Sequence, residues 1–591
     1  MEHVRNHQLI DIKIRQYLLP AVMMKLALQL GNIVDTILVG NLLGTTAMSA
    51  VSLSLPMLSF IQIPGYFLGN GGAIVAGILL GKRRKEEAGK VFTATLLLTV
   101  LCGIVFLAAA FFVTDPIAHL LSGGGELEPM VAQYVFVCLA GSPILGAGLL
   151  LASYFANDSH PQLASAYFII SNAVNLALDF LFLKYTPLGV AGAALSTMTG
   201  FLVGFVVVIP YIRSKKRMIT FASPKLTGEL KKNVAKTGMP FFSYLLATMV
   251  KGLLMNSIVL TLLGETGMVV YTVCNNTGLI LAMLIGGVIG VIPNFAGILY
   301  GEKDFYGIHA LCRKVFQYAY LITGVLMVVV FVFARTFAML FGVDEQGLQS
   351  TVAAVLRIYV FSMPFNAWNS FGMQYYGSVE KSGVATLITT LQNGIFLIPA
   401  ALIGILLGQQ IGGSGFLGLG CAFVLSESLT VFAANIFRKL KYPEEGMLMI
   451  PEENPGICLD FSLPASESEL PAVPREIRGF CKAQGIDGKK ANLIAVAAEE
   501  MIKNIMDHGG DKSKWIDVCL TAEGGRLMLR LRDNGTPFDP TTYEFDDTDF
   551  DIHGIEMATA VAQEISYIRA IDMNNTIIVV WAGINEGIRY S

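Results

Sequence analysis

Near residue 441 the sequence changes from long apolar stretches to a charged, water-compatible segment. This boundary constrains the fold more than any other feature of the sequence. Residues 14–438 consist mainly of apolar stretches, many near the roughly 20 residues that an α-helix needs to cross hydrocarbon. The tail from 441 to 591 holds 26 of the 44 acids and 14 of the 41 bases, so it carries a formal charge of −12 while the preceding part carries +9. A lipid-embedded part is therefore joined to a soluble domain, and a purely soluble enzyme is excluded.

The apolar stretches predict an all-α polytopic membrane protein of twelve helices in two lobes of six, followed by an α+β domain. We divide the chain into a first lobe at residues 10–230, a second lobe at 231–440, a linker at 441–456 and a soluble domain at 457–591. Lys and Arg concentrate in alternate connections, and cytoplasmic loops carry this excess. Because the number of spans is even, we expect a multi-pass plasma-membrane protein with both termini in the cytoplasm.

An internal repeat relates the two lobes. At an offset of 220, Pro20 matches Pro240, Leu42-Leu43-Gly44 matches Leu262-Leu263-Gly264, and residues 76–81 match 296–301; at 221, Pro143 matches Pro364 and Asn172 matches Asn393. Chance matches would not keep register over this length. Six-span repeats share one orientation, so an axis along the membrane normal is expected to relate the lobes, as in transporters that move two halves around a midplane site.

Ionisable residues inside the spans are candidate functional positions, because a charge in hydrocarbon costs at least ~2.5 kcal/mol. Asp35 lies in the first span and Asp179 in the fifth, where Asn175 precedes it by one helical turn on the same face. An acid that faces a wet cavity can release and recapture a proton as its exposure changes. The pair is therefore the candidate coupling site, and the alternative is a static polar contact between helices.

Four further ionisable residues fall in or near spans, namely Lys25, Lys251, Arg357 and Glu427. They can line a transport path, or the long side chains can reach an interface along their apolar stems, and we favour the second interpretation for each. The repeat counterparts of Asp35 and Asp179 are apolar, so we expect the chemistry of the two lobes to differ.

The stretches from Asn32 to Gly44, from Asn175 to Asp179 and from Gly189 to Thr197 together resemble the multidrug and toxic-compound extrusion (MATE) family. The resemblance covers essentially residues 10–440. It implies two six-helix lobes in a V and export of organic compounds driven by inward proton or sodium flow. The positions that match the family's first-lobe cation cluster are Asp35, Asn175, Asp179 and Thr197. The second-lobe acids of some sodium-coupled members have no evident match.

The segment after residue 456 predicts an α+β sandwich. Residues 457–463 alternate like a strand, 466–484 and 488–508 have helical periodicity, and 518–520, 527–531, 565–571 and 576–581 supply further strands. A domain of about 130 residues is large enough to bury its own core.

Three motifs in this segment point to a nucleotide site. Glu500 and Asn504 are one helical turn apart, so one helix face offers a carboxylate base and an amide oxygen for Mg²⁺. Asp533 directly follows a strand and can accept a hydrogen bond from an exocyclic amine, while Gly535 lets the backbone approach a flat ring. Gly554 lies where a helix begins, and amides at that end can face phosphate.

The order and spacing of these motifs resemble the Bergerat-fold ATPases of the GHKL superfamily, especially the anti-sigma-factor serine kinases. The resemblance implies that Asn504 holds Mg²⁺, that Asp533 reads the adenine of ATP, that Gly554 belongs to the phosphate lid, and that Glu500 acts as the base on an attacking hydroxyl. The family's lid usually carries two glycines, and Ile552 stands where the first would be. The closure of the lid over the phosphates therefore has weaker support in the sequence than the binding of adenine.

The leading interpretation is an exporter of small organic cations or amphipathic substrates, coupled to H⁺ or to Na⁺, with a cytoplasmic ATP-binding domain that regulates it. One alternative is a membrane-tethered serine/threonine kinase that acts on a cytoplasmic regulatory protein and uses the membrane part as a sensor. Another is an exporter of lipid-linked cargo. The sequence contains no GxxxxGK[ST] motif, which argues against primary ATP-driven pumping, and we expect no nucleic-acid partner.

The basic loop from Arg213 to Lys236 carries eight Lys and Arg residues. We expect the acidic tail to contact this loop. Attraction between exposed charges is screened beyond about 8 Å at physiological salt, so the sequence predicts a contact that weakens with ionic strength.

Overall fold

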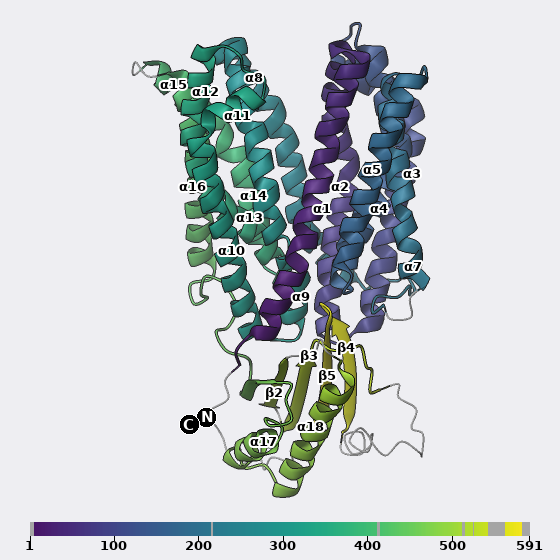
Figure 1. Ribbon diagram of the computed structural model, residues 1–591, viewed down its shortest axis with the longest axis vertical. Coiled ribbons are helices and arrows are strands. Elements are labelled where there is room, and N and C mark those ends of the chain that lie inside the picture. Colours follow the sequence, from purple (N-terminus) through teal and green to yellow (C-terminus); the bar gives the residue numbers. More distant parts are fainter. Residues whose placement is uncertain are drawn as a thin grey trace.

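The computed structural model describes residues 5–213, 217–410, 414–510, 515–523, 525–541 and 562–581. Figure 1 shows two groups of long helices, coloured purple to blue and teal to green, standing over one small sheet with two helices beneath it. The groups lie nearest each other at the end that bears the sheet. A helical part and a separate α+β domain are therefore both present, as the sequence predicts.

The first lobe contains α1 (Gln8–Leu43), α2 (Thr45–Gly81), α3 (Lys85–Ser122), α4 (Glu128–Asn157), α5 (Pro161–Tyr185), α6 (Val190–Gly204), the short η1 (Phe205–Val207) and α7 (Val208–Arg213). The second lobe contains α8 (Gly228–Ile289), α9 (Ile292–Gly301), α10 (Phe305–Val332), α11 (Ala334–Leu340), α12 (Gln346–Tyr359), η2 (Val360–Ser362), α13 (Met363–Ser378), α14 (Ser382–Thr390), the π-helical η3 (Leu391–Ile395), α15 (Leu397–Gln410) and α16 (Gly415–Lys441).

Ten helices among the described residues are long and apolar enough to cross a membrane. The longest, α8, is broken at Gly264 and makes two passes, and α1 runs beside the others over 36 residues. Counted in this way, the helical part makes the twelve passes that the apolar stretches predict.

The internal repeat is visible as matched backbone turns. Gly44 joins α1 to α2 with φ 93° and ψ 173°, and Gly264 breaks α8 with φ 65° and ψ −161°. Residues with a side chain rarely adopt these angles. Gly81 and Gly301, which also match, pack against each other, since a Cβ added to either would lie 3.0 Å or less from the Cα of the other. This reciprocal contact places the pseudo-twofold axis between the ends of α2 and α9.

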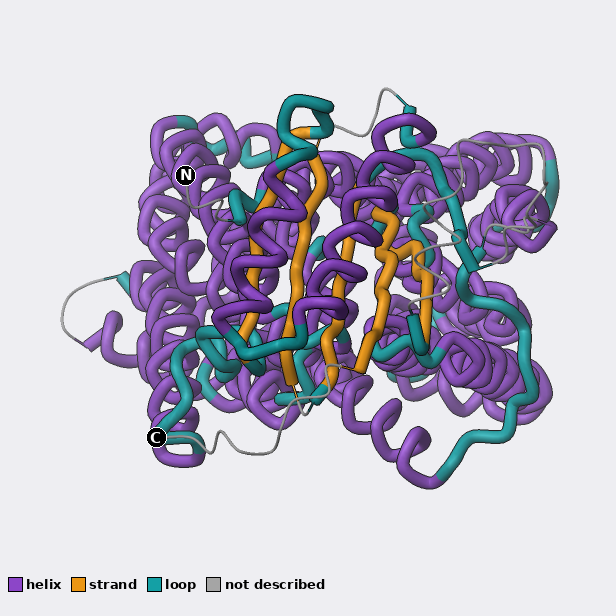
Figure 2. Tube along the Cα trace, turned by 90° about the horizontal axis from the view of Figure 1, so that it is seen from below, coloured by secondary structure: helices purple, strands orange, loops and turns teal. Residues whose placement is uncertain are grey.

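The C-terminal domain is a five-stranded antiparallel sheet with two helices on one face. The strands β1 (Ile457–Pro464), β2 (Trp515–Glu523), β3 (Arg526–Asp533), β4 (Glu564–Ala570) and β5 (Met573–Trp581) lie in the order β1-β2-β3-β5-β4. Seen from below, α17 (Ala472–Ala483) and α18 (Gly488–His508) cover the sheet (Figure 2). Alternate apolar residues of the strands, such as Val518 and Leu529, pack under these helices.

The opposite face of the sheet is polar and is also buried. Three residues at the intervening positions, Asp517, Arg530 and Arg532, are at most 6% exposed. Since the period of a strand is two, these side chains point away from α17 and α18. They point at the helical part of the chain, where the residues that pair with them lie.

Candidate functional site

The predicted acid cluster forms in the first lobe from α1, α5 and α6. Asn175 donates hydrogen bonds to Asp179 Oδ2 (3.3 Å) and to Thr197 Oγ1 (3.2 Å), and Thr197 donates to Asp35 Oδ2 (3.4 Å). Ser196, which the sequence analysis missed, donates to Asp179 Oδ1. The structure therefore brings all four predicted residues into one hydrogen-bonded group.

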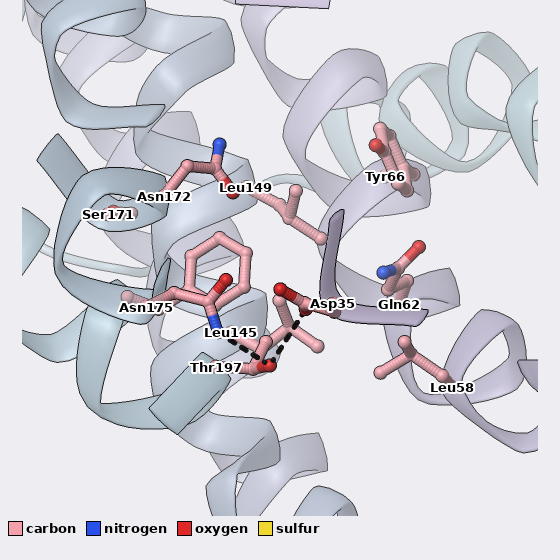
Figure 3. Close-up of a pocket in the computed structure, with 11 residues that line it drawn as sticks. Asp35, Leu58, Gln62, Tyr66, Leu145, Leu149, Ser171, Asn172, Asn175 and Thr197 are labelled. Atoms are coloured by element: carbon pink, nitrogen blue, oxygen red, sulfur yellow. Dashed lines mark hydrogen bonds between the residues drawn. The ribbon is translucent and has the colours of Figure 1, made fainter. Parts of the chain in front are cut away.

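This group borders a cavity of about 130 Å³ (Figure 3). Asp35 points toward Thr197, while Gln62 and Tyr66 of α2 lie on the opposite side of Asp35. Asp179 is completely buried behind the cavity wall. Asp35 Oδ1 is buried and has no hydrogen-bond partner among the described residues. One acid thus faces the cavity with an unsatisfied oxygen, and the other is held behind it.

The second lobe has a half-buried acid of its own, Glu427, which is held inside the lobe and does not reach an interface. Its carboxylate accepts hydrogen bonds from Asn366 (2.9 Å), Asn369 (2.7 Å) and Gln392 (3.0 Å). Lys251 also does not reach an interface, because its ammonium donates to Asn393 (3.3 Å) inside the lobe. The sequence signal was available, because a lone Glu in an apolar span needs nearby amide donors.

Arg357 and Lys25 differ from each other. Arg357 donates to the backbone oxygen of Phe331 (3.2 Å) on an exposed surface, in agreement with our interpretation. Lys25, in contrast, lines a cavity between the lobes, so the interface interpretation is wrong for this residue.

A small pocket of about 20 Å³ lies between α18 and the sheet. Asn504 and Asp533 line it, together with Asn574 and Thr576, whose part in the pocket the motifs did not reveal. Asn504 Nδ2 is buried and has no hydrogen-bond partner among the described residues, so this side chain is free for a ligand. An amide and a buried carboxylate facing one pocket fit the recognition of adenine and the binding of Mg²⁺ by the Asn504 oxygen.

Asp533 is held from one side only. Its Oδ1 accepts hydrogen bonds from the Gly535 N–H (2.7 Å) and from Asn574 Nδ2 (2.9 Å). In the part of the chain that the structure describes, no hydrogen bond reaches Oδ2, which remains available to an exocyclic amine. Burial raises the pKa of Asp533, and the Gly535 N–H and Asn574 oppose this shift. Gly535 is required by close packing, because a Cβ there would lie 2.8 Å from Gly509 Cα.

The other two predicted nucleotide residues lie elsewhere. Glu500 is on α18, one turn before Asn504, and is partly exposed next to the pocket rather than in its lining. Gly554 lies outside the described residues.

Buried ion pairs fix the polar face of the sheet to the helical part. Asp304, which is completely buried in the turn between α9 and α10, accepts from Arg5 (2.8 and 2.9 Å) and from Arg532 (2.9 Å), and Arg530 lies 3.7 Å away. Burial alone would raise the pKa of Asp304, but these guanidinium groups hold it well below its usual value. The free energy that ionised Asp304 contributes to docking is therefore fully present at pH values above the ordinary pKa of Asp, and it is lost only in strong acid.

The domain contacts both lobes. Asn575 donates to Glu302 (2.5 Å) of the second lobe, while Arg83 of the first lobe pairs with Glu564 (3.2 Å). The two turns involved are repeat-related, since Arg83 and Lys303 occupy matching positions and both have a left-handed backbone conformation. The linker is also fixed, because Asn454 Oδ1 accepts from the first backbone N–H group of α10, at Phe305 (2.7 Å).

These contacts correct our expectation for the tail. In the part of the chain that the structure describes, the buried ion pairs of the domain run to Arg5, Glu302 and Asp304, and the basic loop takes no part in them. The side chains of Arg532 and Glu302 are each 3% exposed, so salt screens them weakly. The sequence analysis missed this interface because its partners are about 230 residues apart in the chain.

A continuous polar path joins the nucleotide pocket to α1. Asn574, which holds Asp533, accepts from Arg569 (2.7 Å), and Arg569 pairs with Asp572 in the β4–β5 turn. Asp572 in turn accepts from Lys13 (2.6 Å) near the start of α1. The same helix carries Asp35, twenty-two residues further on. The pocket and the acid cluster are therefore connected through one helix, α1.

Comparisons with known proteins agree with both parts of the fold. The family described as MatE matches residues 20–181 and 240–403, and the histidine kinase-like ATPase domain matches residues 463–581. Multidrug export protein MepA of Staphylococcus saprophyticus is 24% identical over 415 residues, which is 68% of this chain and 88% of that protein. Probable multidrug resistance protein YoeA of Bacillus subtilis is 23% identical over 341 residues, which is 56% of this chain and 73% of that protein.

Solved structures share the fold of the helical part. A MATE protein in complex with MaL6 has a TM-score of 0.67 at 19% identity, over 73% of this chain and 95% of its own. A MOP superfamily transporter from Pyrococcus furiosus has a TM-score of 0.65 at 19% identity, over 73% and 96%.

Two repeat-related helical lobes and a fused nucleotide-binding fold define a membrane transporter with a histidine kinase-like ATPase domain. The two matched segments of the family cover more than half of the sequence and repeat the offset of 220 residues. The chain belongs to the MatE family.

Proposed function

We propose that this protein exports small organic or amphipathic compounds across the plasma membrane in exchange for protons, and that its ATP-binding domain regulates the exchange from the cytoplasm. The observation that carries the proposal is the Asp35–Asp179 group at the wall of a cavity within the first lobe. The relatives named as multidrug export proteins support the class of cargo.

The donor set around the acids favours a proton over a sodium ion. Asp179 receives an N–H group from Asn175 and an O–H group from Ser196. As they are oriented here, these groups stabilise a carboxylate that has released its proton, whereas a sodium ion would need the same side chains turned so that their oxygens face it. Asp35, with one unsatisfied oxygen at the cavity, is the acid positioned to exchange protons with the cavity, and Asp179 acts on it through its charge.

The regulatory role of ATP is supported by the docking of the domain. It binds both lobes at the end where they meet, and its path through Asn574, Arg569 and Asp572 reaches α1. A nucleotide that displaces or tightens Asn574 changes the contact at Lys13, and α1 transmits that change toward Asp35. Because such a path is evidence of contact only, the coupling must be measured.

The decisive experiment uses proteoliposomes in which a pH gradient and ATP are varied independently. We expect the full chain to move a fluorescent amphipathic compound when the gradient alone is applied, and ATP to change the rate. A chain without residues 457–591 should retain gradient-driven flux and lose the ATP response. Uptake driven by ATP in the absence of any ion gradient would refute the proposal, as would complete loss of flux in a correctly inserted deletion variant.

We expect ATP binding to depend on Asp533 and Asn504. Asp533→Ala should weaken the affinity of the full chain for ATP on the order of 10- to 100-fold, the worth of one or two hydrogen bonds to a charged group. Asn504→Ala should lower the affinity only when Mg²⁺ is present. Calorimetric titration of the detergent-solubilised protein provides the measurement, and equal heats for Asp533→Ala and wild type would show that the adenine site is misassigned.

The same titration has an expected pH dependence. The ionised form of Asp533 accepts the hydrogen bond, and burial raises the pKa of this carboxyl. ATP affinity should therefore fall on acidification at a higher pH than an ordinary Asp would cause.

A further inference from the structure

A second cavity, of about 80 Å³, lies between the two lobes. α1, α2 and α4 line it from the first lobe, and the α8–α9 junction and α13 line it from the second. Its polar side chains include Lys25, Asn70, Ser153, Asn157, Asn294 and Gln374. Val22 of α1 lies against Gly287 of α8, where an added Cβ would be 2.7 Å from the Val22 Cα, so α1 contacts both lobes at this level.

Lys25 is the one charged residue in the lining of this cavity, and no acid faces it there. Among the described residues, no hydrogen bond or ion pair reaches its ammonium. Two other lysines of the helical part differ in having partners, Lys251 with Asn393 (3.3 Å) and Lys13 with Asp572 (2.6 Å).

Lys25 lies well inside the span, and its side chain is half-buried. It lies ten residues beyond Arg15, a distance of about 15 Å along the helix. An ammonium without a counter-charge in the spans costs at least ~2.5 kcal/mol, and an anion from outside the chain would offset that cost.

Asn157 provides a second and independent sign of a ligand. This residue is 1% exposed and lines the same cavity. Its Nδ2 donates to Ala73 O (2.5 Å), while its Oδ1 is buried without a partner among the described residues. A buried acceptor without a donor costs about 1–3 kcal/mol of stability. The cavity thus offers a ligand a cation, Lys25, together with a hydrogen-bond acceptor, Asn157. A ligand that carries an anionic group and a hydroxyl or amide N–H satisfies both.

We propose that the inter-lobe cavity binds the anionic group of an amphipathic cargo, a carboxylate or a phosphate, with Lys25 as its counter-charge and Asn157 accepting from a neighbouring donor. This inference rests on the proposed export function and narrows its cargo from small organic or amphipathic compounds to anionic amphiphiles. The cavity adjoins that of the acid cluster, because Tyr66 and Leu149 line both, so the apolar body of the cargo extends beside these two side chains.

Equilibrium binding tests the proposal without any gradient. The probe is a fluorescent dye with a free carboxylate, compared with its methyl ester, on the purified full chain in neutral detergent. We expect the free carboxylate dye to bind more tightly than its methyl ester. Lys25→Gln should lower the affinity for the carboxylate dye on the order of tenfold, and Lys25→Arg should preserve that affinity. Lys184→Gln, which removes a lysine that lies over Phe180 and Tyr185, is the matched control.

A second arm distinguishes a free acid from a lipid headgroup. Phosphatidylglycerol, which joins a phosphate to hydroxyl groups, is added as a competitor, with phosphatidylcholine as the comparison. Displacement by phosphatidylglycerol in wild type but not in Lys25→Gln identifies a lipid phosphate as the source, whereas displacement by neither lipid identifies the free acid.

Equal affinity for acid and ester, with no effect of Lys25→Gln in either arm, would overturn the assignment. The export function is tested separately by gradient-driven flux. Loss of that flux with the binding result intact would therefore refute the exporter and leave the anion site standing.

Discussion

Replacing Asp179 with asparagine is expected to reduce gradient-driven export to the level of the passive leak. An amide carries no charge and cannot take up a proton, so Asp35 loses the neighbouring carboxylate whose charge shifts its proton affinity. The asparagine has nearly the same shape, and its Oδ1 can still accept from Ser196, so the packing of α5 against α6 is expected to persist. Proton-driven efflux from proteoliposomes is the measurement.

Asp115→Asn is the matched control, because it makes the same chemical change at an exposed position near the end of α3. Asp35→Asn should impair export as strongly, since Asp35 provides the carboxylate at the cavity. Elution volume and thermal unfolding check that each variant remains folded. Full activity of the Asp35→Asn/Asp179→Asn double variant would show that protons are carried elsewhere, with Glu427 as the next position to test.

Replacing Asp304 with asparagine is expected to release the ATP-binding domain from the helical part. Three guanidinium groups surround this carboxylate, and removal of one partner from a buried ion cluster costs about 3–5 kcal/mol. Asp304 also caps α10 by accepting from the Gly307 N–H (3.0 Å), a role that asparagine fills equally well. The substitution therefore removes the charge and keeps the cap.

Hydrogen exchange of the β4–β5 hairpin measures the release, and flux with and without ATP measures its consequence. We expect faster exchange, retained gradient-driven flux and no ATP response. Asp487→Asn, at the exposed N-cap of α18, is the control for a capping Asp that makes no contact with the helical part. Unchanged exchange in Asp304→Asn would contradict the docked arrangement.

Asp572→Asn separates docking from signalling. It weakens the contact with Lys13 and leaves the Asp304 cluster in place. We expect the domain to remain bound and the ATP response to fall. A full response in this variant would exclude the path through Arg569 and Asp572 as the route of regulation.

The sequence by itself determined the class of the protein. Hydrocarbon thickness fixes the length of a span, so the apolar stretches were sufficient to predict two lobes of six. Repeat-related Gly44 and Gly264 could be paired because a left-handed turn requires the same residue in both copies. Asp533 and Asn504 were recognisable because a helix or a strand fixes the spacing of neighbouring functional groups.

The tertiary structure alone decided how charges far apart in the chain meet. Arg5, Asp304 and Arg532 form one cluster although 228 residues separate the last two, and no local pattern encodes such a pairing. The same reason explains Lys25 and Glu427, which look alike in sequence as lone charges in apolar spans. Lys25 borders a cavity, whereas Glu427 accepts hydrogen bonds from three amides. The packing of the helices, not the local sequence, decides what each charge faces.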